Sequence, residues 1–134
     1  MHLISNEDVM RGDLAKFGVE YRSPCYISIN DCSGFLASNA GIRPGFAAYT
    51  DDGYLLIYID GITGAAQIAI TSDNVTSLDI KKLPLLPEHS IKIKGIQDGN
   101  KFYYKLLLPH KSGKSFPSQK ENTADLISFL EYWK

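Results

Sequence analysis

Short segments in which apolar and polar positions alternate, each bounded by turn residues, make up most of the chain. Residues 54–59 are six consecutive apolar or aromatic residues between Asp51-Asp52-Gly53 and Asp60-Gly61, and so short a run is typical of a buried strand. The neighbouring segments 45–49 and 66–70 also alternate, and turn-forming connections join each of them to the central run. The sequence therefore predicts a three-stranded antiparallel meander at the centre of a β-rich domain.

Further strands are expected before and after this meander. Residues 21–29 have an extended pattern with Pro24 near the start, and residues 75–81 alternate as a half-buried strand should. Residues 34–44 mix small, polar and turn residues, which favours a surface loop or a short extra strand. Two prolines interrupt residues 83–87, which we interpret as a connection held by Leu85 and Leu86 in the core.

The clearest local signal is a hairpin over residues 90–108. Asp98-Gly99 is among the strongest signals for a two-residue turn, because both residues tolerate positive φ. With that turn, the predicted cross-strand pairs are Ile91 with Leu106, Ile93 with Tyr104, Lys92 with Lys105 and Lys94 with Tyr103. A turn at Gly99-Asn100 pairs Lys94 with Lys105 instead, and in either register a lysine and tyrosine face lies opposite an aliphatic face. We expect Gly99 to matter for the turn and Gln97, at the strand end, to contribute little.

Helices are predicted at the two ends. Over residues 5–17 the apolar side chains recur at helical spacing, with Ser5 or Asn6 as the cap. From residue 122 the pattern is helical again, with Asn122 or Thr123 as the cap and one apolar stripe formed by Leu126, Ile127, Leu130 and Trp133. The expected organisation is a single domain over 1–134, with a helical extension (1–20), a β-rich body (21–120) and a C-terminal helix (121–134).

Charge is distributed unevenly. The net charge of the 134 residues is −1, which excludes a generally basic nucleic-acid binder. Nine lysines nevertheless lie between residues 81 and 120, where the acidic residues are Glu88 and Asp98. This part of the chain is therefore locally cationic.

The cysteines and the apolar segments indicate the cellular compartment of the protein. Cys25 and Cys32 have no neighbouring Cys or His that would complete a zinc site, so we expect free thiols and no metal. The first residues lack the pattern of a secretory signal, and no segment approaches the length of about 20 apolar residues that a membrane span needs. A cytoplasmic protein without a transmembrane segment is expected.

The order of the predicted elements resembles a known superfold. Seven strand candidates followed by one amphipathic helix are similar to the pleckstrin-homology-like (PH-like) superfold, and residues 45–58 and 70–82 resemble bacterial members of it and the related GRAM domains. The resemblance implies a mainly β domain (α+β by count): a bent antiparallel sheet or partly open barrel of about seven strands, closed by the C-terminal helix and acting as a binding module. Many relatives bind phosphorylated lipid headgroups or peptides, and the lipid-binding members usually carry a cluster of Lys and Arg around the first two strands. Here those strands carry only Arg22 and Arg43.

Catalytic chemistry finds no support in the residue spacing. His2, His89 and His110 are far apart in sequence, and none has the spacing of a familiar triad or metalloprotease motif. We predict a non-enzymatic module, without a cofactor, that recognises an anionic protein or lipid surface through Lys92, Lys94, Tyr103 and Lys105. The alternatives are a small β-rich enzyme with its site at residues 35–43, and a structural homo-oligomer. A nucleic-acid partner is not expected, because aromatic residues in a sheet more often belong to the core.

Overall fold

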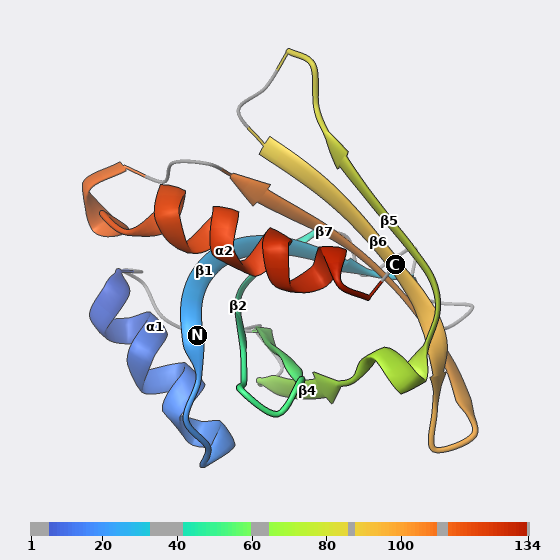
Figure 1. Ribbon diagram of the computed structural model, residues 1–134. Helices are drawn as coiled ribbons and strands as arrows, with labels where there is room; N and C mark the ends of the chain where they lie inside the picture. The colour runs from blue at the N-terminus through green and yellow to red at the C-terminus, as the bar shows by residue number, and fades with distance from the viewer. Residues whose placement is uncertain (1–5, 33–41, 60–64, 86–87, 110–112, 134) are drawn as a thin grey trace.

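The fold is a curled antiparallel sheet with a helix in its curve, as seen in a computed structural model (Figure 1). The structure describes residues 6–32, 42–59, 65–85, 88–109 and 113–133. Within them, seven strands are hydrogen-bonded in the order β4-β3-β2-β1-β7-β6-β5. The strands are β1 (Arg22–Asp31), β2 (Arg43–Tyr49), β3 (Leu55–Ile59), β4 (Ala66–Ile70), β5 (Val75–Lys82), β6 (Glu88–Gln97) and β7 (Asn100–Pro109). The predicted mainly β fold class, a half-barrel with a C-terminal helix, is confirmed.

The meander forms as predicted. In β2, β3 and β4, Ala47 pairs with Ile57 and Ile57 pairs with Ile68, all antiparallel. All five residues of β3 are buried, because a core lies on each side of this strand. On the inner, concave side, Ile57 packs with residues of the opposite strands and with Leu126 of α2 (Gln119–Glu131). On the outer side, Tyr58 packs with Met10 of α1 (Glu7–Leu14).

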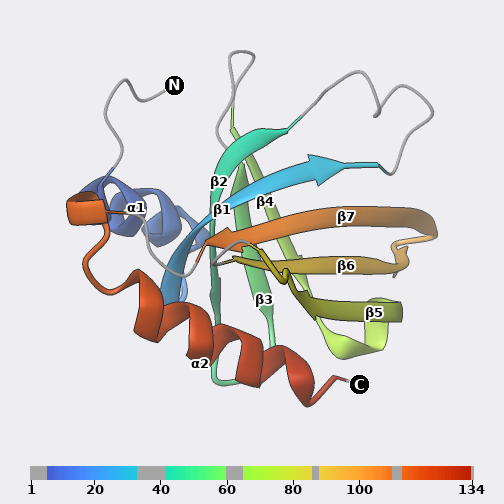
Figure 2. The same ribbon diagram turned by 90° about the horizontal axis from the view of Figure 1, so that it is seen from above.

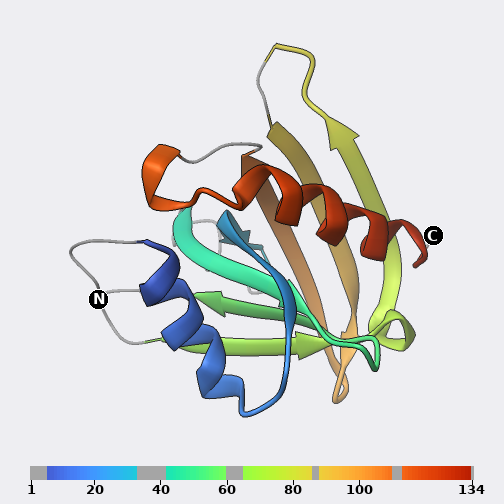
Figure 3. The same cartoon turned by 60° about the vertical axis from the view of Figure 1, so that its left-hand side comes forward.

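The two helices therefore stabilise different sides of the sheet. Figures 2 and 3 show α2 lying along the concave side and α1 beside β1 on the other side. On the outer side, α1 contacts β1, β2 and β3, and its Met10 and Leu14 pack with Phe46, Tyr58 and the connecting residue Phe116. The outer face of β5, β6 and β7 has no helix over it in the described part of the chain. That half of the sheet presents its outward side chains to solvent.

The hairpin of β6 and β7 has the predicted register. Gln97 pairs with Asn100, and the two turn residues Asp98 and Gly99 have φ of 53° and 80°. Both values lie in the left-handed region that a two-residue turn of this type requires. The four predicted cross-strand pairs are all present: Ile91 with Leu106, Ile93 with Tyr104, Lys92 with Lys105 and Lys94 with Tyr103.

The predicted cap is confirmed for α1 and wrong for α2. Asn6 caps α1, its side-chain oxygen accepting a 2.9 Å hydrogen bond from the Val9 amide. Helix α2 begins earlier than predicted, at Gln119. Asn122 and Thr123 lie inside the helix, where the Asn122 amide donates to the Pro24 carbonyl at 2.9 Å and the Thr123 hydroxyl to the Pro109 carbonyl at 3.4 Å. Their polar atoms hold the helix to β1 and β7.

Gln119 of α2 makes three hydrogen bonds to the main chain of the sheet. Its buried amide accepts a hydrogen bond from the Tyr26 nitrogen at 2.8 Å and donates to the carbonyl oxygens of Tyr26 at 2.8 Å and Pro109 at 2.9 Å. The predicted apolar stripe lies against the inner core, but only Leu126 and Leu130 are fully buried, whereas Ile127 and Trp133 are partly exposed.

The connection at residues 83–85 departs from expectation. Leu85 was expected in the core, and 93% of it is exposed. The prediction is wrong because β5 and β6 already supply the inward apolar side chains of this edge of the sheet, among them Ile80 and Ile91. Leu86 lies outside the described residues.

Candidate functional site

The four predicted site residues lie together on the outer face of β6 and β7. We call Lys92, Lys94, Tyr103 and Lys105 the lysine–tyrosine face. The three lysines are exposed and Tyr103 is half-buried. The ammonium of Lys94 lies 4.7 Å from the centre of the Tyr103 ring, and that of Lys105 lies 5.5 Å from it. Tyr103 thus brings two cations together, since the electron-rich face of the ring attracts each of them.

Within the described residues, no carboxylate lies close enough to these lysines to form an ion pair. Lys92 of β6 pairs with Asp79 of β5 on one side and with Lys105 of β7 on the other. The Asp79 carboxylate, however, contacts Lys81, at 3.7 Å. Like charges placed opposite one another in a sheet destabilise it by some tenths of a kcal/mol. The face therefore carries positive charge at a small cost in stability.

Some cations elsewhere in the protein are paired with carboxylates. The Lys16 ammonium lies 3.1 Å from the Asp13 carboxylate, and the Arg22 guanidinium binds both carboxylate oxygens of Asp51. The hydrogen bond from Arg22 also lowers the pKa of Asp51. These two cations are compensated inside the protein, unlike those of the lysine–tyrosine face.

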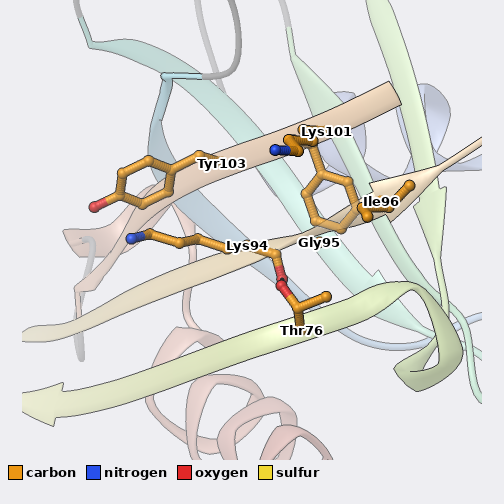
Figure 4. A pocket seen from close by; sticks show the side chains of 7 residues that line it. Thr76, Lys94, Gly95, Ile96, Lys101 and Tyr103 are labelled. Atoms are coloured by element: carbon orange, nitrogen blue, oxygen red, sulfur yellow. The ribbon is translucent and has the colours of Figure 1, made fainter. Parts of the chain in front are cut away.

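A hollow of about 390 Å³ adjoins the lysine–tyrosine face near the hairpin turn. Figure 4 shows Lys94 extending along β6 toward Tyr103, with Thr76 projecting from β5 beside it. This volume is at the lower end of the range for ligand sites, about 300–1,000 Å³. Two cations, a phenol, a hydroxyl and an exposed apolar side chain surround it, and the full lining is Thr76, Lys94, Gly95, Ile96, Lys101, Phe102 and Tyr103.

Local irregularity of the sheet accompanies this hollow. The register between β5 and β6 shifts between Val75 and Ser77, so Thr76 is an extra residue opposite Gly95 and Lys94. Gly95 has no side chain, and a Cβ there would lie 2.0 Å from the Asn74 carbonyl oxygen and 2.5 Å from the Phe102 ring. A bulge typically re-aims side chains and bends its strand. Here it brings Thr76 next to Lys94, to whose carbonyl its hydroxyl donates at 3.3 Å.

Five residues that line this hollow were not among the predicted site residues: Thr76, Gly95, Ile96, Lys101 and Phe102. Lys101 could have been included, because it alternates with Tyr103 and Lys105 along β7. Ile96 could also have been included, because it alternates with Lys92 and Lys94 along β6, whereas Thr76 could not, because a bulge of one residue leaves no sign in the sequence.

The described residues contain no group of three His, Cys, Asp or Glu side chains that could hold a metal ion. Cys25 and Cys32 are both free thiols, as predicted. Burial raises the pKa of the Cys25 thiol to about 12, so this sulfur stays protonated and is a poor nucleophile at neutral pH. Most of the alternative enzyme site at residues 35–43 lies outside the described residues, as do His2 and His110.

Comparison with known proteins finds a similarity in fold but none in sequence families. No family model and no curated protein matches it. Among solved structures it is similar to the C-terminal domain of an unknown protein from Leishmania infantum, with 16% sequence identity and a TM-score of 0.50. The match covers 92% of this chain and 97% of that one. Separately, none of the described helices is long and apolar enough to cross a bilayer.

Proposed function

We propose that this protein is a non-enzymatic binding module that recognises an acidic protein partner through the lysine–tyrosine face. The observation that carries the proposal is the set of three exposed lysines without a carboxylate partner in the described chain, two of them gathered over Tyr103. Such a cluster attracts an anionic surface, and a partner that supplies the missing carboxylates removes the repulsion between Lys92 and Lys105.

The shape of the face favours a protein over a membrane surface. The adjoining hollow accepts a side chain or a small group, whereas a flat lipid surface would leave it unfilled. Ile96, which is 46% exposed, is the exposed large apolar residue of this hollow, and stable attachment to a membrane usually requires a broader apolar face. A curled sheet with a helix in its curve also supports membership of the PH-like superfold. We place the module in the cytoplasm, in keeping with its two free thiols.

Charge reversal tests the proposal. Lys92→Glu with Lys105→Glu should weaken binding to an immobilised oligoglutamate peptide by more than about tenfold, and binding by the parent should fall between low and physiological salt as charges become screened. The matched control, Lys114→Glu with Lys120→Glu, changes the net charge equally at two exposed sites outside the face. It should bind more tightly than the first variant.

Three results would contradict the proposal. They are equal loss of binding in both double variants, binding that does not depend on salt, and binding only to vesicles containing phosphatidylserine. Thermal melts of both variants separate loss of binding from loss of folding.

A further inference from the structure

Ile96 is an apolar residue at one end of the lysine–tyrosine face. Along β6 it alternates with Lys92 and Lys94. The inward residues Ile91 and Ile93 of this strand are fully buried, whereas 46% of Ile96 is exposed. The Ile96 side chain therefore meets solvent on the same side of the sheet as the lysines.

The hollow beside the lysine–tyrosine face is apolar next to Ile96 and cationic around it. Lys94 lines this hollow, but its ammonium lies 4.7 Å from the centre of the Tyr103 ring. Figure 4 shows Lys94 extending away from Ile96 toward Tyr103. The part of Lys94 nearest Ile96 is then its hydrocarbon stem, and such stems commonly cover apolar surface. Lys101, which pairs with Ile96 across the strands, adds a second cation to the lining.

This arrangement favours an apolar side chain in the hollow, with acidic residues next to it in the partner. The volume of about 390 Å³ accommodates one leucine or phenylalanine side chain, and contact with Ile96 removes apolar surface of both from water. A carboxylate pressed against Ile96 would instead lose hydration without gaining a hydrogen bond from it. Carboxylates on either side of the apolar residue can still reach the ammonium groups of Lys94 and Lys101.

The spacing along β6 sets the order of the partner's side chains. Ile96, Lys94 and Lys92 are successive residues of one face, about 6.6 Å apart at roughly 3.3 Å per residue. An extended segment has the same repeat, so its side chains at every second position can face them. With an apolar residue over Ile96, the carboxylates two and four positions away lie over Lys94 and over the pair of Lys92 and Lys105. The apolar residue therefore belongs at one end of the acidic run and not at its centre.

We propose that the partner contributes an extended acidic segment with one large apolar side chain at its end, and that this side chain occupies the hollow against Ile96 while the carboxylates contact the lysines. This inference rests on the proposed function, because it names the kind of segment that the same face recognises. The carboxylates attract the segment, and the apolar side chain fixes its register on the sheet.

The test uses the whole chain and fluorescent peptides of about seven residues, either all glutamate or with leucine or glutamine at each position in turn. Leucine and glutamine remove the same charge, so the ratio of their affinities reports the apolar contact. Near one end of the peptide, leucine should bind about tenfold tighter than glutamine, a gain within what burial of a leucine side chain gives. The ratio should be smaller at the central position, and equal ratios at all positions would overturn the inference.

Substitution of Ile96 tests whether this residue causes the preference. Ile96→Ser should reduce the preference for leucine over glutamine to less than about twofold. The Asn74 side-chain amide donates to the main-chain carbonyl of Ile96, at 3.4 Å, so the substitution removes no partner from this bond. Val19→Ser is the matched control, because Val19 is 52% exposed and lies before β1, outside the hollow. This variant should keep the full preference.

Other outcomes separate the two proposals. If the parent binds all-glutamate peptide but prefers leucine at no position, or if the preference survives Ile96→Ser, the hollow does not take an apolar side chain and the proposed function stands. If the parent binds no acidic peptide, the proposed function fails and this inference fails with it. Should Ile96→Ser not fold, Ile96→Thr keeps a branched side chain suited to a strand, and retention of the full preference in that variant overturns the inference.

Discussion

The side-chain amide of Gln97 donates a 2.7 Å hydrogen bond to the main-chain carbonyl oxygen of Ala69. Gln97 is the last residue of β6, and Ala69 lies on β4 at the opposite edge of the sheet. The bond therefore connects parts of the sheet that the strand ladder leaves apart. The expectation that Gln97 contributes little to stability overlooks this contact, because position in a hairpin does not show which distant backbone atoms lie nearby.

Replacing Gln97 should lower the free energy of unfolding. Gln97→Val keeps a strand-forming residue but leaves the Ala69 carbonyl without this donor, at a cost of about 1 kcal/mol. The matched control is Gln67→Val, the same substitution at an exposed position of β4. Urea unfolding of the two variants checks the prediction, and equal midpoints would show that the bond contributes nothing.

Gly95 should not tolerate even a methyl group. A Cβ at this position would lie 2.0 Å from a main-chain oxygen, so Gly95→Ala must displace the backbone at the β5 bulge, and we expect a loss of about 2 kcal/mol or more. Gly12→Ala is the control, since a Cβ there meets nothing within 4 Å. In the middle of α1 it should instead stabilise the protein by about 0.5–1 kcal/mol. Thermal melts that shift in the same direction for both would contradict this account.

The stability that each side chain of α2 contributes should depend on how deeply it is buried and not on its size. Leu130 is fully buried, so Leu130→Ala should cost about 2–5 kcal/mol by leaving a cavity in the inner core. Trp133→Ala should cost less, because Trp133 is partly exposed. Tyr132→Ala, at a side chain that is 90% exposed, should change stability by less than about 0.5 kcal/mol. Chemical denaturation gives the order of the three losses in stability. A Trp133 variant that is less stable than the Leu130 variant would contradict the prediction.

Asp125 should contribute to the acid sensitivity of the fold. Hydrogen bonds from Ser23 and from the Tyr49 hydroxyl, the latter at 2.7 Å, lower the pKa of this carboxyl. The folded state therefore binds the proton less readily than the unfolded chain does. Its stabilisation is present above the unfolded value of about 3.9 and is lost as the pH falls through the lower folded pKa.

Because Asp125 is exposed, its contribution should stay below about 1 kcal/mol. Asp125→Asn keeps acceptor oxygen for Ser23 and Tyr49 but does not titrate. Unfolding free energies measured from about pH 5 to pH 2 should decline less steeply for this variant than for the parent. If stability declined with pH equally in the variant and the parent, the hydrogen bonds from Ser23 and Tyr49 to Asp125 would not stabilise the fold in solution.

The parts of this protein that could be predicted from its sequence are those set by neighbouring residues. The register of β6 and β7 follows from the turn at Asp98-Gly99, and it pairs Lys92 with Lys105 and Lys94 with Tyr103 in the lysine–tyrosine face. The bulge at Thr76 and the burial of Gln119 depend on contacts between segments distant in sequence. Gln119 also follows a segment rich in lysine, serine and proline, so its environment in the sequence resembles that of a loop.

Because the helices cover the sheet unequally, its strands should differ in how readily they unfold locally. Strands β1 to β3 lie between α1 and α2, whereas β5 and β6 have a core on one side and solvent on the other. Main-chain amides should therefore exchange with deuterium most slowly in β3, where every residue is buried, and fastest in β5 at the edge. The strands that carry the lysine–tyrosine face would then be able to loosen while the other half of the domain stays folded.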